Sequence, residues 1–318
     1  MKKRIALLLL AALLLTGCTA ALPPESTAEP AASGGLTFTD DLGREISLGA
    51  VPRRTACLLG SFADLWTLAG GTCIASPNDA WDDYGLELPG AADLGGVMHP
   101  SLEKLLAAEP DFILASAGSK THMEWKDTLE AAGIPVAYFR VSGYRDYLRM
   151  LKICTGLLGN PAAYETCGAA VEAEIDAAVA AARDAAAAGA EVPSILHMRM
   201  AASGLRVKNS RGNVLGEMAK ELSCENIADS DDSLLENLSM EHILVQDPDF
   251  ILLVQQGDDA AGARAVLDAF IAENPAWQSL SAVQNDRVLI LDKRLFSLKP
   301  NALWGQAFTQ LQQLLFAQ

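Results

Sequence analysis

The sequence SLEKLLAAEPDFIL (residues 101–114) returns later in the chain as SMEHILVQDPDFIL (residues 239–252), with eight of the fourteen positions identical. Each copy begins with a serine suited to capping a helix and continues with apolar residues at helical spacing. A Pro-Asp pair then ends the helix, because proline disfavours helical backbone in the residue before it, and Phe-Ile-Leu starts an apolar run of strand length. The repeat therefore predicts two equivalent helix-to-strand units and a duplicated α/β fold.

The outward positions of the two predicted helices differ between the copies except for one acidic residue, which is Glu103 in the first and Glu241 in the second. One explanation is local, since an acid in the first turn complements the helix dipole. The other is that both carboxylates face a partner that contacts the two halves of the chain in the same way.

On either side of the repeat, short apolar runs alternate with helical patterns, which favours βα units and parallel sheets. A hairpin is expected at 36–48, capping a sheet edge, and a polar, aromatic loop at 77–94. The first half adds strands at 55–59, 72–76 and 135–139, with helices from 61 to 71 and from 122 to 132. The second half adds strands at 194–198, 205–208 and 287–291, a strand ending at 254, and helices at 213–223, 264–272 and from 300 onward.

The stretch 147–189 contains no strand candidate. Pro161 suits the first turn of a helix that would run to Ala188, about 28 residues or roughly 42 Å. A helix of that length exceeds an ordinary crossover and favours a role in spanning both halves. We therefore predict two Rossmann-like α/β lobes with parallel sheets, at 36–160 and 190–318, joined by one long helix at 161–189.

The first eighteen residues, MKKRIALLLLAALLLTGC, combine a basic start, an apolar run and small residues before a cysteine. The apolar run is too short for a permanent membrane span, so residues 1–17 are interpreted as an export signal. Leu15-Thr16-Gly17-Cys18 resembles the bacterial lipobox, which implies that Cys18 is acylated. Residues 18–35 lack periodicity and are expected to form a flexible tether. The protein is therefore expected outside the cytoplasm, lipid-anchored to the bacterial cell membrane.

The formal net charge of −16 makes nucleic acid an improbable partner. The acidic residues are scattered along the chain, which is typical of a solvated surface. Apart from Cys18 there are five cysteines, and none lies in a CxxC motif or at metal-ligand spacing. We interpret most of them as small buried hydrophobes, and a Cys57–Cys73 bridge between neighbouring strands stays open as an alternative.

Several motifs in this order resemble the substrate-binding lipoproteins of ABC importers, and within them the family that binds ferric siderophores, haem and cobalamin. The residues that carry the resemblance are TDDLGREISL with Pro52-Arg53-Arg54, Asp93-Leu94-Gly95-Gly96, the two repeat copies, and Lys299-Pro300-Asn301-Ala302-Leu303-Trp304. They span nearly the whole chain after the tether. The resemblance implies a single long helix between the lobes, ligand capture in the cleft, and delivery to a permease dimer.

The resemblance also implies that acidic residues at the positions of Glu103 and Glu241 meet arginines of the permease. No chemistry on the ligand is expected, and no cofactor or catalytic residue is predicted. The absence of GxSxG, GxxxxGK[ST] and HExxH motifs agrees with a protein that is not an enzyme. A helix-linked pair of lobes is further expected to close through a small angle, because bending a continuous helix is costly.

Ligands of parallel sheets lie beyond the carboxyl ends of the strands, so the loops that follow each strand supply the candidate cleft residues. Aromatic, Met, His and basic side chains dominate these loops and suit a flat, partly anionic ligand. The predicted ligand-binding residues are Trp81, Tyr84, Met98, His99, Trp125, Arg140, Arg199, Phe296 and Lys299. A haem ligand would also need an axial side chain, for which Met98, His99 and Met123 are available.

Two alternatives stay open. His99, His122 and His197 follow or end predicted strands, and their convergence in the cleft would make the protein the zinc- or manganese-binding lipoprotein of a metal importer. The second alternative is a signalling lipoprotein or an exported enzyme with the same fold. In that case the acidic loop 229–232 would form a calcium or catalytic site.

Overall fold

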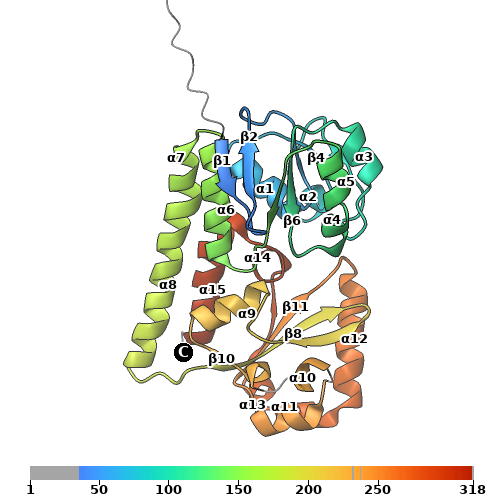
Figure 1. Ribbon diagram of the computed structural model, residues 1–318. Helices are drawn as coiled ribbons and strands as arrows, with labels where there is room; N and C mark the ends of the chain where they lie inside the picture. The colour runs from blue at the N-terminus through green and yellow to red at the C-terminus, as the bar shows by residue number, and fades with distance from the viewer. Residues whose placement is uncertain (1–35, 231–232, 237, 317–318) are drawn as a thin grey trace, which may run out of the picture. The chain divides into compact units, whose positions relative to one another are not determined.

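The computed structural model describes residues 36–230, 233–236 and 238–316 (Figure 1). The predicted signal, Cys18 and the tether lie outside these residues, as does part of the acidic loop. The first lobe contains a five-stranded parallel sheet in the order β5-β4-β3-β6-β7. Its elements are β3 (Thr55–Cys57), α1 (Gly60–Leu68), β4 (Cys73–Ser76), α2 (Asp79–Asp82), β5 (Ala92–Asp93), α3 (Leu102–Ala107), β6 (Phe112–Ser116), α4 (Lys120–Glu124), α5 (Lys126–Ala131), β7 (Val136–Phe139) and α6 (Tyr144–Leu157).

The second lobe has the order β10-β8-β11-β12, all parallel, and β9 pairs antiparallel with β8. Its strands are β8 (Ser194–Ala201), β9 (Gly204–Lys208), β10 (Glu225–Asn226), β11 (Phe250–Gln255) and β12 (Val288–Leu291). Its helices are α9 (Val214–Glu221), η2 (Ile227–Asp229), α10 (Ser233–Glu236), α11 (Met240–Gln246), α12 (Ala260–Glu273), η3 (Pro275–Ser279), α13 (Ser281–Gln284), α14 (Lys293–Phe296), η4 (Asn301–Leu303) and α15 (Trp304–Phe316). The predicted α/β fold of two lobes is confirmed.

The two repeat copies fold in the same way, as α3-β6 and α11-β11. Ser101 Oγ accepts a hydrogen bond from the Lys104 N–H (3.2 Å), and Ser239 Oγ accepts one from the His242 N–H (3.4 Å). Both helices end at a left-handed residue, Glu109 with φ 48° and Asp247 with φ 39°. The predicted caps are therefore present, and the chain leaves each helix through the left-handed residue that precedes the proline.

The Pro-Asp aspartates have a role that the sequence did not reveal. The Asp111 carboxylate accepts hydrogen bonds from the N–H groups of Arg53 and Arg54, just before β3. Asp249 accepts from the N–H and hydroxyl of Ser194, which begins β8. Because β6 pairs with β3 and β11 pairs with β8, each aspartate fixes the start of the strand beside its own.

The predicted hairpin is present as β1 (Leu36–Thr39) and β2 (Glu45–Leu48), which pair antiparallel. The buried Asp40 carboxylate holds its turn by accepting from the N–H groups of Leu42 and Arg44. It also accepts from the N–H of Tyr138 in the edge strand β7 (3.2 Å). The hairpin is thus attached to the edge of the first sheet. The segment predicted as a loop, 77–94, instead contains α2 and β5, two elements too short to show periodicity.

The long helix is continuous from α7 (Pro161–Tyr164) through a π-helical turn, η1 (Glu165–Ala169), into α8 (Ala170–Ala187). Figure 1 shows α8 beside the closing helix α15, and these two helices are in extensive contact. Both contribute to a hydrophobic core that includes Phe112 of the first sheet and Leu252 of the second. The opposite face of each sheet has its own separate core. A core shared between lobes supports the expected small closing angle, since a large rotation would expose it.

The cysteines named as a candidate bridge, Cys57 and Cys73, are buried thiols on adjacent strands and are not bonded to each other in this structure. Burial raises the pKa of the Cys57 thiol well above its usual range. Cys57 and Cys73 therefore fit the interpretation as small buried hydrophobic residues, and not the disulfide alternative.

Asn301 joins the lobes at a second place. Its amide nitrogen donates to Ser61 O and to Asp64 Oδ2, both at 2.8 Å, and its φ is 54°. Asparagine tolerates left-handed backbone better than alanine does. We predict that Asn301→Ala lowers the free energy of unfolding by about 3 kcal/mol, as two acceptors lose their donor and the backbone is strained.

Urea unfolding of three variants tests the Asn301 prediction. Asn301→Gly keeps the left-handed backbone and should lose only about 2 kcal/mol. The control Asn285→Ala removes an exposed amide whose nitrogen donates to Ser281 O, and it should change stability by less than about 0.5 kcal/mol. Equal stability of Asn301→Ala and wild type would contradict the prediction.

Candidate functional site

A cavity of about 250 Å³ lies between the two lobes, at the carboxyl ends of β3 and β8. In the chain order, β3 and β8 are the first strands of their parallel sheets, and later strands are added on both sides of each. Parallel sheets bind ligands at the carboxyl end of such a switch point. The first lobe contributes Leu59, Ser61, Asp79, Asp83, Tyr84, Val97, Val141 and Ser142. The second lobe and the segment after α14 contribute Arg199, Gly212, Asn213, Val214, Ser297, Leu298 and Lys299. We call this cavity the cleft.

Two half-buried cations, Arg199 and Lys299, line the cleft. Within the described part of the chain, no ion pair engages the Arg199 guanidinium or the Lys299 ammonium. Burial lowers the pKa of Lys299, and the nearby Arg199 charge lowers it further, whereas Asp79 acts in the opposite direction. Burial also lowers the pKa of Arg199. An anion that entered the cleft would relieve this desolvated, like-charged pair.

The first lobe presents acceptors to the same cavity. Asp79 Oδ2 accepts a hydrogen bond from the Gly60 N–H (2.9 Å), whereas Asp79 Oδ1 is buried and has no partner among the described residues. Burial raises the pKa of Asp79 to about 6, and the Asp83 carboxylate contributes to the rise. Tyr84 donates its hydroxyl hydrogen to Lys299 O (3.2 Å), and burial raises the pKa of Tyr84. The cleft is therefore acidic on one side and basic on the other.

Charged contacts cross between the lobes beside the cleft. Lys293 Nζ donates to Asp83 Oδ1 at 2.7 Å, and Arg294 donates to Asp64 Oδ2 at 3.1 Å. Arg145 of α6 pairs with Glu221 of α9 through both guanidinium nitrogens. The Lys293–Asp83 and Arg294–Asp64 pairs are half-buried and hold the lobes around the cavity more firmly than the exposed Arg145–Glu221 pair does.

Among the nine predicted ligand-binding residues, the structure brings Tyr84, Arg199 and Lys299 together in the cleft. Met98 is 73% exposed and His99 is also exposed, and neither lines the cavity, although their neighbour Val97 does. Phe296 is 1% exposed because its ring belongs to the shared core.

The other three predicted residues lie away from the cavity lining. Trp81 packs against the shared core, and Trp125 packs against the outer core of the first lobe. The Arg140 guanidinium donates to Ala117 O (3.2 Å). Each of them follows a strand, but the backbone turns their side chains elsewhere.

Sequence reasoning missed Asp79, Asp83 and Asn213 as cleft residues. Both aspartates fall in the segment expected as a polar, aromatic loop, 77–94. A usable signal was the four-residue spacing of Asp79 and Asp83, because residues four apart in a helical turn share one face. Asn213 was expected as the start of a helix, and its side chain does cap α9 by accepting from the Gly216 N–H (2.9 Å).

The histidines do not form the alternative metal site. His122 and His197 are buried, and burial lowers their pKa values to about 4 and about 3. His122 Nδ1 accepts from the Ser116 N–H (3.1 Å), whereas His99 lies on the surface. Throughout residues 36–230, 233–236 and 238–316, no group of three or more His, Cys, Asp or Glu side chains is placed to hold a metal ion.

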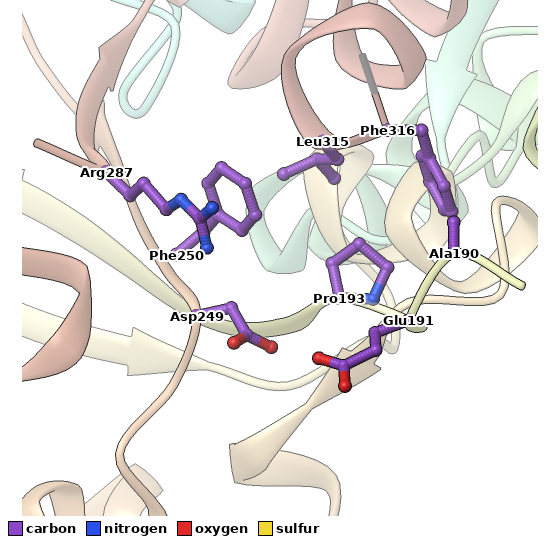
Figure 2. A pocket seen from close by; sticks show the side chains of 8 residues that line it. All are labelled: Ala190, Glu191, Pro193, Asp249, Phe250, Arg287, Leu315 and Phe316. Atoms are coloured by element: carbon purple, nitrogen blue, oxygen red, sulfur yellow. The ribbon is translucent and has the colours of Figure 1, made fainter. Parts of the chain in front are cut away.

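A second cavity, of about 310 Å³, lies at the opposite edge of the second sheet, where its strands begin (Figure 2). Pro193, Phe250, Leu315 and Phe316 form its apolar part. The Asp249 carboxylate beside it is already engaged by Ser194, and the Arg287 guanidinium lies 5.1 Å from the centre of the Phe250 ring. This cavity is larger than the cleft, but its lining includes one basic residue, Arg287, whereas the cleft has both Arg199 and Lys299. We therefore assign the candidate site to the cleft.

The sequence profile of the periplasmic binding protein family matches residues 57–295. The Bacillus subtilis (strain 168) protein YhfQ, whose name assigns it provisionally to the ABC transporter substrate-binding lipoproteins, is 24% identical over 311 residues, covering 92% of each chain. In the described part of the chain, no helix has the length and apolar character needed to cross a membrane.

Two solved structures share the fold. The siderophore-binding protein BauB, bound to two acinetobactin molecules and ferric iron, superposes with a TM-score of 0.69 at 16% identity, covering 88% of this chain and 99% of that one. Staphylococcus aureus IsdE, complexed with heme, superposes with a TM-score of 0.66 at 15% identity, covering 83% and 99%.

Proposed function

The chain belongs to the periplasmic binding protein family, and we propose that it serves an ABC importer by capturing an anionic ferric siderophore in the cleft. The family has a binding role in transport and is not enzymatic. The observation that carries the proposal is the pair of desolvated cations, Arg199 and Lys299, which line the cavity and form no ion pair with any described residue. Arg binds carboxylates in a bidentate geometry, which suits the anionic groups of such a ligand.

One further observation favours a siderophore over haem. Haem needs an axial ligand, and Tyr84 is the candidate that lines the cleft, yet its hydroxyl is engaged by Lys299 O and its pKa is raised rather than lowered by burial. The cleft, at about 250 Å³, lies below the usual range of about 300–1,000 Å³ for small-molecule sites, so a ligand of siderophore or haem size would require the lobes to open further.

Delivery to a permease is the second half of the proposal. Glu103 and Glu241 are exposed, and they occupy equivalent positions on α3 and α11. A two-fold symmetric permease dimer would contact both through copies of the same surface. The name of the relative YhfQ supports an assignment to ABC transport.

A ligand panel tests the proposal. Purified residues 36–318 would be titrated with ferric acinetobactin, ferric citrate, haem and cyanocobalamin while tryptophan fluorescence is followed, after the visible spectrum and metal content are recorded. We expect a ferric chelate to bind most tightly. A stoichiometric zinc or manganese ion in protein that ignores all four compounds would contradict the proposal and restore the metal-importer alternative.

We also propose that Cys18 carries a lipid anchor, as its lipobox and the short apolar run before it suggest. Cells that express the full chain and are fed labelled palmitate should incorporate the label into the wild type and not into Cys18→Ala. The serine variant Ser26→Ala, in the same tether, should keep the label. Unlabelled wild-type protein released into the medium would refute the anchor.

A further inference from the structure

Resting on the proposed function, we infer that Asp79 selects ligands that carry a hydrogen-bond donor beside their anionic groups. The substrate would then belong to the hydroxycarboxylate or aminocarboxylate class, and a ligand that presents only acceptors would be rejected. The inference starts from the unpartnered oxygen of Asp79 in the cleft wall. It extends the proposed function, which assigns only the anionic character of the ligand.

The position of Asp79 is fixed by close packing of α1 on α2. Gly60 N–H donates to Asp79 Oδ2 at 2.9 Å. A Cβ added at Gly60 would lie 2.6 Å from the Ala80 nitrogen, so only glycine allows this approach. The hydrogen bond to Gly60 holds one oxygen of the carboxylate against α1. Oδ1 stays buried and lacks a donor within the described residues. Leaving such an acceptor unpaired is costly, and a ligand donor would remove that cost.

The Lys299 ammonium does not donate a hydrogen bond to the unpartnered Oδ1 of Asp79. Lys299 influences the Asp79 carboxylate electrostatically, but the two groups form no ion pair in the described part of the chain. A gap thus separates an acceptor on the first lobe from the cations Lys299 and Arg199. A ligand with a carboxylate and a neighbouring O–H or N–H matches this arrangement, because its anion meets the cations while its donor reaches Asp79.

The charge of Asp79 gives the inference a pH signature. The Gly60 N–H, Lys299 and the N–H of Asp79 itself favour the ionised form, whereas Asp83 disfavours it. Tyr84 is a further titratable neighbour of Asp79. With a pKa of about 6, Asp79 is protonated below that pH and ionised above it. A ligand donor binds the ionised acceptor more strongly, so affinity should rise as the pH passes upward through about 6. A ligand with only anionic groups would show the opposite slope.

The test compares Asp79→Asn with the control Asp82→Asn. Asp82 lies on the same short helix, is exposed, and is not among the cleft residues. The amide introduced by Asp79→Asn would keep its carbonyl oxygen on the Gly60 N–H and turn its NH₂ group, a donor, toward the ligand donor. Calorimetric titration at pH 7.5 would use the compound from the panel of ferric acinetobactin, ferric citrate, haem and cyanocobalamin that binds wild type most tightly.

We expect Asp79→Asn to weaken binding on the order of tenfold or more and Asp82→Asn to change it less than about twofold. Between pH 5 and pH 7.5 the affinity of wild type should rise, and the affinity of Asp79→Asn should lack this step. Tight wild-type binding with an unaffected or tighter Asp79→Asn variant would overturn the inference and leave the proposed function standing. Failure of wild type to bind any of the four compounds would overturn both. Matching thermal unfolding of the two variants checks that the fold is intact.

Discussion

Reversing the two repeat carboxylates together, as Glu103→Arg with Glu241→Arg, is expected to lower ligand uptake by roughly tenfold or more while ligand affinity is unchanged. Close charge pairs at an interface contribute about 1.5 kcal/mol or more each, and charge reversal turns attraction into repulsion at both contacts. The single reversals should each have a smaller effect, because one half of the two-fold contact would remain.

A docking role and a helix-dipole role predict different results for this variant. Each helix already has its serine cap, Ser101 or Ser239, and that cap does not involve the glutamate. Losing a favourable dipole interaction at an exposed position costs about 0.3–1 kcal/mol, so the double variant should remain folded. Both glutamates lie on α3 and α11, outside the cleft lining, so ligand affinity should be preserved.

Uptake would be measured in cells that carry the importer, and permease ATPase stimulation in proteoliposomes. The matched control is Glu124→Arg with Glu273→Arg, which reverses one exposed glutamate in each lobe on other helices. The control should transport like wild type. If the Glu103 and Glu241 double variant folds, binds ligand and transports normally, then these glutamates serve only the ends of their helices.

The second large effect is expected in the cleft. Arg199→Gln with Lys299→Gln should weaken binding of an anionic ferric siderophore by about 1,000-fold, since each charge-assisted hydrogen bond contributes about 1.5–3 kcal/mol. The same change should not destabilise the protein. The folded-state pKa of Lys299 is lowered, so its charge opposes folding at neutral pH, and a neutral side chain removes that penalty.

The matched control for the cleft variant is Arg206→Gln with Lys220→Gln, which removes the same charge. Arg206 faces Arg199 across the β8-β9 pair but is exposed, and Lys220 is exposed on α9. The affinity of this control for the ligand should stay within about threefold of wild type, because salt screens the interaction between exposed charges and a ligand in the cleft. Equal affinities of the two double variants would show that net charge, and not the cleft cations, attracts the ligand.

Repeats and periodicity predicted most of the fold because local rules determine those features. Ser101 and Ser239 cap their helices as their position before an apolar stripe indicates. The bonds from Asp111 to the start of β3 and from Asp249 to the start of β8 could not be predicted, because they join residues more than fifty positions apart. Nothing in a single sequence specifies such register-setting contacts.

The site was only partly predictable for a related reason. The rule that loops after parallel strands line the cleft selected Tyr84, Arg199 and Lys299, which do line the cavity, yet it also selected Phe296, whose ring is buried in the shared core. Residue type does not say which way a side chain turns. Asp79 was overlooked because α2 is a four-residue helix with no periodic pattern, and its burial arises from α1 packing through Gly60.

The position of iron in a complex tests the central claim most directly. Crystals of residues 36–318 with the ferric chelate that binds most tightly would be measured at the iron absorption edge, and the anomalous difference map would locate the metal. We predict one peak in the cleft, with chelate oxygens bonded to Arg199 and Lys299. An iron peak in the cavity lined by Phe250 and Phe316 (Figure 2) would contradict the account. So would fully occupied iron sites elsewhere in the crystal with none in the cleft.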